Sequence, residues 1–122
     1  MYKVIVIDDE MLVRRGIVME TDWQTLNCVV VAEAGNGIEG LEAVRKYHPD
    51  LLICDIRMPK MTGSEFLHYL KSNELFKHIP VMMLSCEEST TERIRLLEEG
   101  AVDYILKPFN PMELKVRLKK FI

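Results

Sequence analysis

Five polar residues, each placed at the end of a short apolar run, could together do chemistry on a phosphoryl group. They are Asp8, Asp9, Asp55, Ser85 and Lys107. Clustered carboxylates repel one another, and a magnesium ion relieves this because it binds one or two carboxylates and keeps positions for water and phosphate oxygens. A hydroxyl and an ammonium group can hold other phosphoryl oxygens. An aspartate beside the metal can act as the nucleophile toward phosphorus.

Each of these residues alone also has a simpler explanation. Solvent at a turn tolerates the Asp8–Asp9 pair, and Asp55 can cap the turn that follows it. Single serines are most often hydrogen-bonded to a turn, and single lysines are most often solvated. The combination is therefore the informative feature, and it requires that the fold bring the five residues together.

The apolar runs that precede these residues are typical of parallel strands covered by helices on both faces. Strands are predicted at residues 4–7, 28–32, 51–54, 81–84 and 104–106. Helices are predicted at 11–20 and from residues 36, 62, 89 and 110 onward. This alternation predicts one α/β domain with a doubly wound parallel sheet. Ligands of such sheets bind beyond the carboxyl ends of the strands, where the polar residues would meet.

Two predicted helices carry clear start signals. Ser89-Thr90-Thr91-Glu92 has a capping-box pattern, and Asn110-Pro111-Met112-Glu113 offers a cap followed by a proline in the first turn. We expect the fourth helix to bury Ile94 and Leu97. The fifth should bury an apolar stripe made of Leu114, Leu118, Phe121 and Ile122.

Composition limits the partners and the compartment. The 122 residues carry a formal net charge of -3, with a pI near 5.6, which argues against direct contact with nucleic acid. No apolar run is long enough to cross a membrane, and no secretory signal precedes the first strand. Cys28, Cys54 and Cys86 lack the spacing of a disulfide framework, so we expect buried, reduced thiols. These features predict a cytoplasmic protein.

Four groups of residues carry a resemblance to a known family. They are Asp8-Asp9, Asp55 with Met58-Pro59 and Gly63, Ser85, and Asp103-Tyr104-Ile105-Leu106-Lys107-Pro108. The chain resembles the receiver domain of two-component response regulators over residues 1–122. The resemblance implies a flavodoxin-like (βα)5 fold with a parallel five-stranded sheet of order 2-1-3-4-5. It also implies a regulatory phosphoprotein that catalyses only its own phosphorylation and dephosphorylation. An enzyme that turns over a separate substrate is not expected.

The resemblance assigns roles at the phosphoryl site. Asp55 is the expected phosphoacceptor, which takes its phosphoryl group from the phosphohistidine of a sensor histidine kinase. Asp9 and Asp55 are expected to bind Mg²⁺ directly, with the backbone carbonyl of Arg57 as a third ligand and Asp8 acting largely through water. Lys107 is expected to pair with the phosphoryl group, and its bond to the following proline is cis in the family.

The resemblance also implies a switch. Ser85 resembles the hydroxyl that moves toward the phosphoryl group, and Tyr104 the aromatic ring that turns inward with it, although a tyrosine packed at the surface is the simpler explanation. The surface of the fourth helix, fifth strand and fifth helix would then control an output domain and favour a phosphorylation-dependent homodimer. Its charged residues, which equally fit an ordinary solvated surface, are Arg93, Arg95, Asp103 and Arg117.

Some features depart from the minimal family pattern. Residues 19–26 are similar to the extended segments of receivers joined to AraC-type DNA-binding domains, so a C-terminal DNA-binding output domain and a role in transcription are expected. Trp23 in this segment also fits a hydrophobic lid over the first helix. Cys86 is larger than the residue usual after the switch hydroxyl and could narrow access to Asp55. Arg57 and Glu87 occupy positions that tune the lifetime of the phosphoryl group.

Three other functions fit the sequence less well. Haloacid-dehalogenase-like phosphatases have a second aspartate two residues after the nucleophile, where this chain has Arg57. A nucleotide or flavin binder needs a glycine-rich loop after the first strand, where this chain has Asp8-Asp9-Glu10-Met11. A degenerate receiver that serves only as an interaction module would not need the complete set of site residues.

Overall fold

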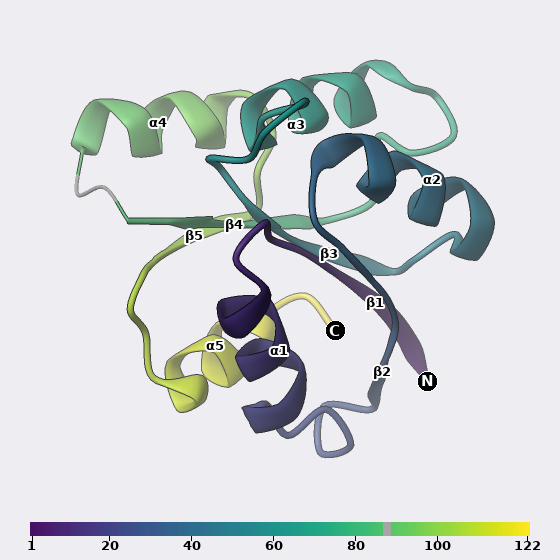
Figure 1. The fold of residues 1–122 in the computed structure, drawn as a ribbon, viewed down its shortest axis with the longest axis vertical. Coiled ribbons are helices and arrows are strands. Elements are labelled where there is room, and N and C mark those ends of the chain that lie inside the picture. Colours follow the sequence, from purple (N-terminus) through teal and green to yellow (C-terminus); the bar gives the residue numbers. More distant parts are fainter. Residues whose placement is uncertain (87–88) are drawn as a thin grey trace.

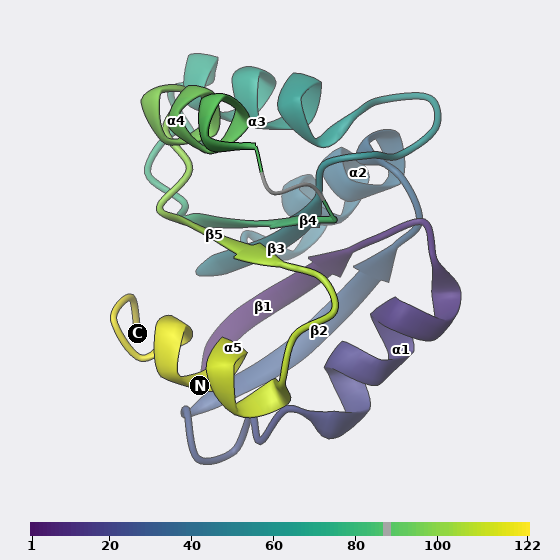
Figure 2. The ribbon, with the colours of Figure 1, turned by 90° about the vertical axis from the view of Figure 1, so that its left-hand side faces the viewer.

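The computed structural model describes residues 1–86 and 89–122 as one layer of parallel strands between two layers of helices (Figures 1 and 2). Strands and helices alternate in the order β1 (Tyr2–Ile7), α1 (Met11–Glu20), β2 (Cys28–Ala34), α2 (Gly37–Tyr47), β3 (Leu51–Asp55), α3 (Gly63–Ser72), β4 (Val81–Ser85), α4 (Thr90–Glu98), β5 (Asp103–Leu106) and α5 (Pro111–Leu118). The strands pair in the order β2-β1-β3-β4-β5, which confirms the predicted fold and sheet order.

The helices divide between the two faces of the sheet. Helices α2, α3 and α4 cover one face, and α1 and α5 cover the other (Figure 2). Successive residues of a strand point to opposite faces. Accordingly, Ile5 and Ile7 pack in the core under α2–α4, while Val4 and Val6 pack in the core under α1 and α5. This two-sided burial explains why the strands are unbroken apolar runs in the sequence.

Local hydrogen bonds explain where the helices begin. Asn36 caps α2 by accepting from the Glu39 amide at 2.9 Å, and Asn110 caps α5 by accepting from the Met112 amide at 2.8 Å. The Ser89 hydroxyl accepts from the Glu92 amide at 3.2 Å, whereas the Glu92 carboxylate is hydrogen-bonded to Arg95. The reciprocal capping box lies at α3 instead, between Thr62 and Glu65.

Two expectations about burial were wrong. Ile94 and Leu97 on α4 are 50% and 43% exposed, and Leu96 is the α4 residue that is fully buried. The helix is turned so that Leu96, between these two, points at the sheet. Cys86, the residue after β4, is also exposed, while Cys28 and Cys54 lie buried on strands.

The predicted apolar stripe is buried at Leu114 and Leu118 and only partly buried at Phe121 and Ile122, and the predicted packing of Trp23 is confirmed. Leu114 and Leu118 of α5 are buried, and Phe121 and Ile122 pack against the same core beyond the end of the helix. The indole of Trp23 is buried in this core and donates a hydrogen bond to the Val18 carbonyl oxygen at 3.0 Å. Within the described residues, no helix has the length and apolar character that crossing a membrane requires.

Candidate functional site

Four carboxylates meet at the carboxyl ends of β1 and β3. Each of Asp8, Asp9, Glu10 and Asp55 offers one oxygen, and these oxygens all lie within 4.8 Å of one another. The two strands are neighbours, and Ile7 pairs with Cys54 in their register, so the residues that follow this pair emerge side by side. The side chain of Asp8 is fully buried, while Asp9 and Glu10 are exposed. Glu10 was not among the predicted site residues, although its place beside Asp9 in the sequence is a visible signal.

Every polar group of Asp8 has a partner. Its amide donates to the Ala34 carbonyl oxygen at 3.0 Å, and its carbonyl oxygen accepts from Arg14 Nη1 at 2.8 Å. One carboxylate oxygen accepts from the Glu10 amide at 2.9 Å, and the other from Lys107 Nζ at 2.7 Å. A fully buried carboxylate requires such compensation, because desolvation of a charge is costly.

Lys107 brings the fifth strand to this cluster. Besides its contact with Asp8, its ammonium lies 3.3 Å from Asp55 Oδ1 and 3.4 Å from Glu10 Oε1. Its amide donates to the Ser85 carbonyl oxygen at 2.6 Å, and the Lys107–Pro108 peptide bond is cis, as the resemblance implied. Burial alone would lower the pKa of Lys107, but the hydrogen bond and charge of Asp8, together with Asp55, raise that pKa above its ordinary value.

Asp55 is a buried carboxylate with a raised pKa. It is 5% exposed, and burial together with the charge of Asp8 raises its pKa to about 6, although Lys107 opposes the shift. Ser85 is 4% exposed and ends the neighbouring strand β4. An ammonium group, a hydroxyl-bearing residue and several acidic oxygens are therefore gathered at one edge of the sheet.

The donor set fits magnesium. Mg²⁺ prefers oxygen ligands and binds through one or two carboxylates, and the described cluster offers carboxylate oxygens alone. A divalent cation would also relieve the repulsion that raises the pKa of Asp55.

The loop after Asp55 is folded tightly against the end of β3. The Gly63 amide donates to the Ile56 carbonyl oxygen at 2.8 Å, and a Cβ on Gly63 would lie 2.3 Å from the Asp55 carbonyl oxygen. Arg57 is exposed in this loop, two residues after Asp55. The assignment of its carbonyl as a metal ligand stays a prediction, and Glu87 lies outside the described residues.

The comparisons with known proteins decide the family. A family model for the response regulator receiver domain matches residues 4–119. The chain belongs to this family. Receiver domains of response regulators accept phosphoryl groups from histidine kinases, and the resemblance found in the sequence is thereby confirmed.

Solved receiver structures resemble this domain along nearly its whole length. The REC domain of AraT, a response regulator from Geobacillus stearothermophilus, is 31% identical with a TM-score of 0.89, and the match covers 98% of this chain and 92% of that one. The chemotaxis response regulator CheY4 of Vibrio cholerae is 31% identical with a TM-score of 0.88, over 100% and 99% of the two chains.

Curated relatives are longer proteins. The phosphate regulon transcriptional regulatory protein PhoB of Pseudomonas aeruginosa is 35% identical over 116 residues, which are 95% of this chain and 49% of PhoB. The sensor histidine kinase TmoS of Ectopseudomonas mendocina is 38% identical over 104 residues, which are 85% of this chain and 10% of TmoS. The chain thus spans about half or less of the length of the curated relatives it matches.

The receiver domain's expected switch ring is buried. Tyr104 is 5% exposed and packs in the core under α2–α4, and the guanidinium carbon of Arg93 lies 5.4 Å from the centre of its ring. Such a distance suits a cation–π contact. On the same surface Arg117 Nη1 lies 3.1 Å from Asp103 Oδ2. Arg95 points toward α3 instead, where its Nη2 lies 2.7 Å from Glu92 Oε1 and 3.2 Å from the Ser64 hydroxyl oxygen. Of the charged residues predicted for this surface, Asp103 and Arg117 therefore pair with each other and Arg93 lies over the ring, whereas the prediction for Arg95 was wrong because its partners lie on α4 and α3.

Proposed function

We propose that this receiver domain, spanning residues 1–122, is a phosphorylation switch in which Asp55 accepts the phosphoryl group. The placement of Lys107 Nζ carries the proposal: it lies 2.7 Å from Asp8 Oδ2 and 3.3 Å from Asp55 Oδ1, beside a cluster of acidic oxygens. In the transfer, an oxygen of ionised Asp55 forms a bond to phosphorus while the bond from phosphorus to the donor's histidine nitrogen breaks, and that nitrogen keeps the electron pair.

The chain's own residues would position the phosphoryl group. Asp9, Asp55 and the Arg57 carbonyl would hold Mg²⁺, with Asp8 acting largely through water. The bound metal ion supplies charge neutralisation for the phosphoryl oxygens. Lys107 would turn from its carboxylate partners toward a phosphoryl oxygen, and the Ser85 hydroxyl would donate to another.

The proposed output follows from the surface that contains Tyr104. Movement of Ser85 would change the packing of this ring, and with it the α4–β5–α5 surface. In the whole protein this surface would control a DNA-binding output domain, consistent with relatives that are transcriptional regulators, and an AraC-type domain remains our proposal for its class. We expect a sensor histidine kinase as phosphodonor, a regulatory role without turnover of a separate substrate, and a cytoplasmic location.

The test is a labelling experiment. The protein is incubated with phosphoramidate and MgCl2, and its intact mass is measured. We expect one added phosphoryl group, lost in Asp55→Asn and retained in Asp50→Asn. Asp50 is a matched control because it is an exposed aspartate whose carboxylate accepts from the Lys3 amide, away from the cluster. Equal labelling of Asp55→Asn and the wild type would refute the assignment.

A second experiment addresses self-association. The paired charges and the buried ring on the α4–β5–α5 surface offer a face that phosphorylation could alter. Sedimentation velocity with and without beryllofluoride, a phosphoryl mimic, should show a larger species only with the mimic. Identical sedimentation in both conditions would count against a phosphorylation-dependent homodimer.

A further inference from the structure

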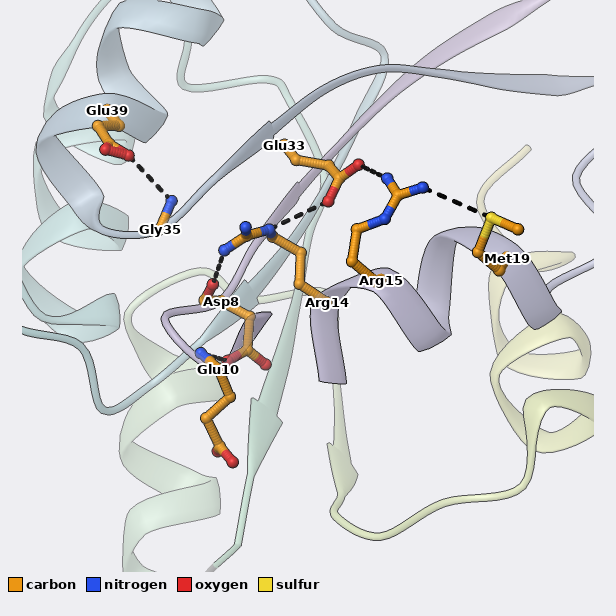
Figure 3. Close-up of polar contacts among 8 residues, drawn as sticks. All are labelled: Asp8, Glu10, Arg14, Arg15, Met19, Glu33, Gly35 and Glu39. Carbon is orange, nitrogen blue, oxygen red and sulfur yellow. Dashed lines mark hydrogen bonds and ion pairs between the residues drawn. The ribbon is translucent and has the colours of Figure 1, made fainter. Parts of the chain in front are cut away.

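Arg14 of α1 joins three elements through one guanidinium group (Figure 3). Its Nη1 donates to the Asp8 carbonyl oxygen at 2.8 Å, and its Nε donates to Glu33 Oε1 on β2 at 3.1 Å. The side chain is 17% exposed, and a Cβ on Gly35 would lie 3.7 Å from Nη1, so the turn after β2 lies close over the guanidinium. The Arg14 side chain is therefore mostly buried and held by hydrogen bonds to two acceptors.

The contact with Asp8 has a consequence for the acidic cluster. The carbonyl that Arg14 holds belongs to the peptide that joins Asp8 to Asp9. The amide of Asp8 is fixed by the Ala34 carbonyl oxygen of β2. Both sides of Asp8 are thus tied to elements outside the turn, and the plane of the peptide before Asp9 is set by Arg14. The direction in which the Asp9 carboxylate leaves the turn depends on that plane.

The charges suit a positioning role. Glu33 is shared by Arg14 and Arg15, and it balances the positive charge near the cluster (Figure 3). The two carboxylate oxygens of Asp8 accept from Lys107 and from the Glu10 amide, while Arg14 donates to the backbone oxygen of Asp8. Arg14 can therefore hold the turn without occupying an oxygen that a cation needs.

The geometry also requires the shape of a guanidinium. Two acceptors on different elements are reached from Nε and Nη1 in one plane. A lysine ammonium keeps the charge but lacks this rigid fork. Replacement of Arg14 by lysine therefore separates an effect of charge from an effect of directed hydrogen bonds.

We propose that Arg14 is a positioning residue for divalent-cation binding, which acts by fixing the Asp8–Asp9 peptide from its anchor on Glu33. This inference rests on the proposed function, because it assumes that Asp8 and Asp9 belong to a metal site. Groups that orient metal ligands typically change metal affinity by roughly 10- to 100-fold when they are removed. Arg14 should show an effect of this kind although it binds no metal itself.

The test is calorimetric titration of each folded variant with MgCl2. Arg14→Gln should weaken Mg²⁺ binding by roughly 10-fold or more, and Arg14→Lys by at least about threefold. Arg15→Gln is the matched control, because Arg15 is on the same helix and pairs with the same Glu33, while its other hydrogen bond goes to Met19 and not to Asp8. Its affinity should stay within about twofold of the wild type. If Arg14→Lys binds Mg²⁺ as tightly as the wild type while Arg14→Gln binds it more weakly, the positive charge of residue 14 is sufficient. That result would overturn the positioning role.

Glu33→Gln keeps the inference testable if Arg14→Gln does not fold, since it leaves Arg14 in place but weakens its anchor. We expect an intermediate loss of Mg²⁺ affinity and faster hydrogen exchange at the Glu10 amide, which donates to Asp8 Oδ1. Unchanged affinity in both Arg14→Lys and Glu33→Gln, with normal uptake by the wild type, overturns the inference and leaves the proposed function standing. Absence of Mg²⁺ uptake by the wild type overturns both.

Discussion

The carbonyl oxygen of Asp55 lies so close to Gly63 that a Cβ on the glycine would sit 2.3 Å from it. The same Cβ would lie 2.7 Å from Ile56 Cα, so both obstacles are backbone atoms. The start of α3 is therefore packed directly against the end of β3. The backbone of Asp55, the proposed phosphoacceptor, keeps this position because Gly63, eight residues further along the chain, has no side chain.

Gly63→Ala should consequently destabilise the domain. Overpacking of a tight site lowers the free energy of unfolding by about 1–3 kcal/mol. The loss in this variant should lie at the upper end of that range, because the clashing atoms belong to the backbone and cannot rotate away. Denaturant unfolding of the wild type and the variant measures the change. Gly16→Ala is the matched control, because no atom outside its own helix backbone lies within 4 Å of its built Cβ. In mid-helix this change should stabilise by about 0.5–1 kcal/mol. Equal effects in the two variants would contradict the close approach.

Asp55→Asn should stabilise the protein in EDTA at pH 7.5. Burial and the charge of Asp8 raise the pKa of Asp55 to about 6, above its ordinary value of 3.8. Well below pH 3.8 the carboxyl is neutral in both the folded and unfolded states and contributes nothing to stability. As the pH rises from about 4 to about 6, the unfolded state ionises first, so stability falls, and the full penalty of about 1–3 kcal/mol is present above this window.

The measurement is urea unfolding of both proteins at pH 7.5 and pH 4.5. The advantage of Asp55→Asn should shrink at the lower pH, and Asp50→Asn should show no such advantage. Addition of MgCl2 should stabilise the wild type more than Asp55→Asn, because the cation gains a ligand only in the former. If Asp55→Asn is less stable than the wild type in EDTA at pH 7.5, then burial of the Asp55 charge and its repulsion by Asp8 do not destabilise the folded state as proposed.

The sequence predicted the sheet well because its strands are buried on both faces. Runs such as Val4–Ile7 and Leu51–Cys54 have few other interpretations in a chain of this length. The meeting of Asp8 with Asp55 needed one further piece of information, namely that β1 and β3 are neighbours. That adjacency came from the family resemblance and not from spacing.

Other features depended on tertiary contacts that spacing does not encode. Ile94 and Leu97 form a plausible apolar stripe on a short helix, yet Leu96 is the side chain that meets the sheet. Arg14 looks like a solvent-facing arginine of an amphipathic helix, but in the fold its guanidinium donates to the Asp8 carbonyl oxygen and to Glu33 on β2. Such contacts join segments that are distant along the chain.

Lys107→Met should destabilise the metal-free protein. The ammonium is mostly buried and contacts Asp8, Asp55 and Glu10, so its loss leaves acidic groups without a partner. Breaking a buried pair from one side costs about 3–5 kcal/mol, and the partial exposure here suggests roughly 2–4 kcal/mol. Thermal unfolding in EDTA measures the loss, with exposed Lys120→Met as the control. MgCl2 should restore more stability to Lys107→Met than to the wild type. A midpoint in EDTA equal to that of the wild type would argue against this account.

The three thiols should differ sharply in reactivity. Cys86 is exposed, whereas Cys28 and Cys54 are buried. Burial raises the pKa of both buried thiols, and the charges of Asp55 and Asp8 raise that of Cys54 further. Since the thiolate is the nucleophile, an aromatic disulfide reagent should react quickly with one thiol in the native protein and with all three in denaturant. Cys86→Ala should remove the fast phase, and Cys28→Ala should leave it unchanged. A fast phase that survives in Cys86→Ala would mean that a strand cysteine is open to solvent.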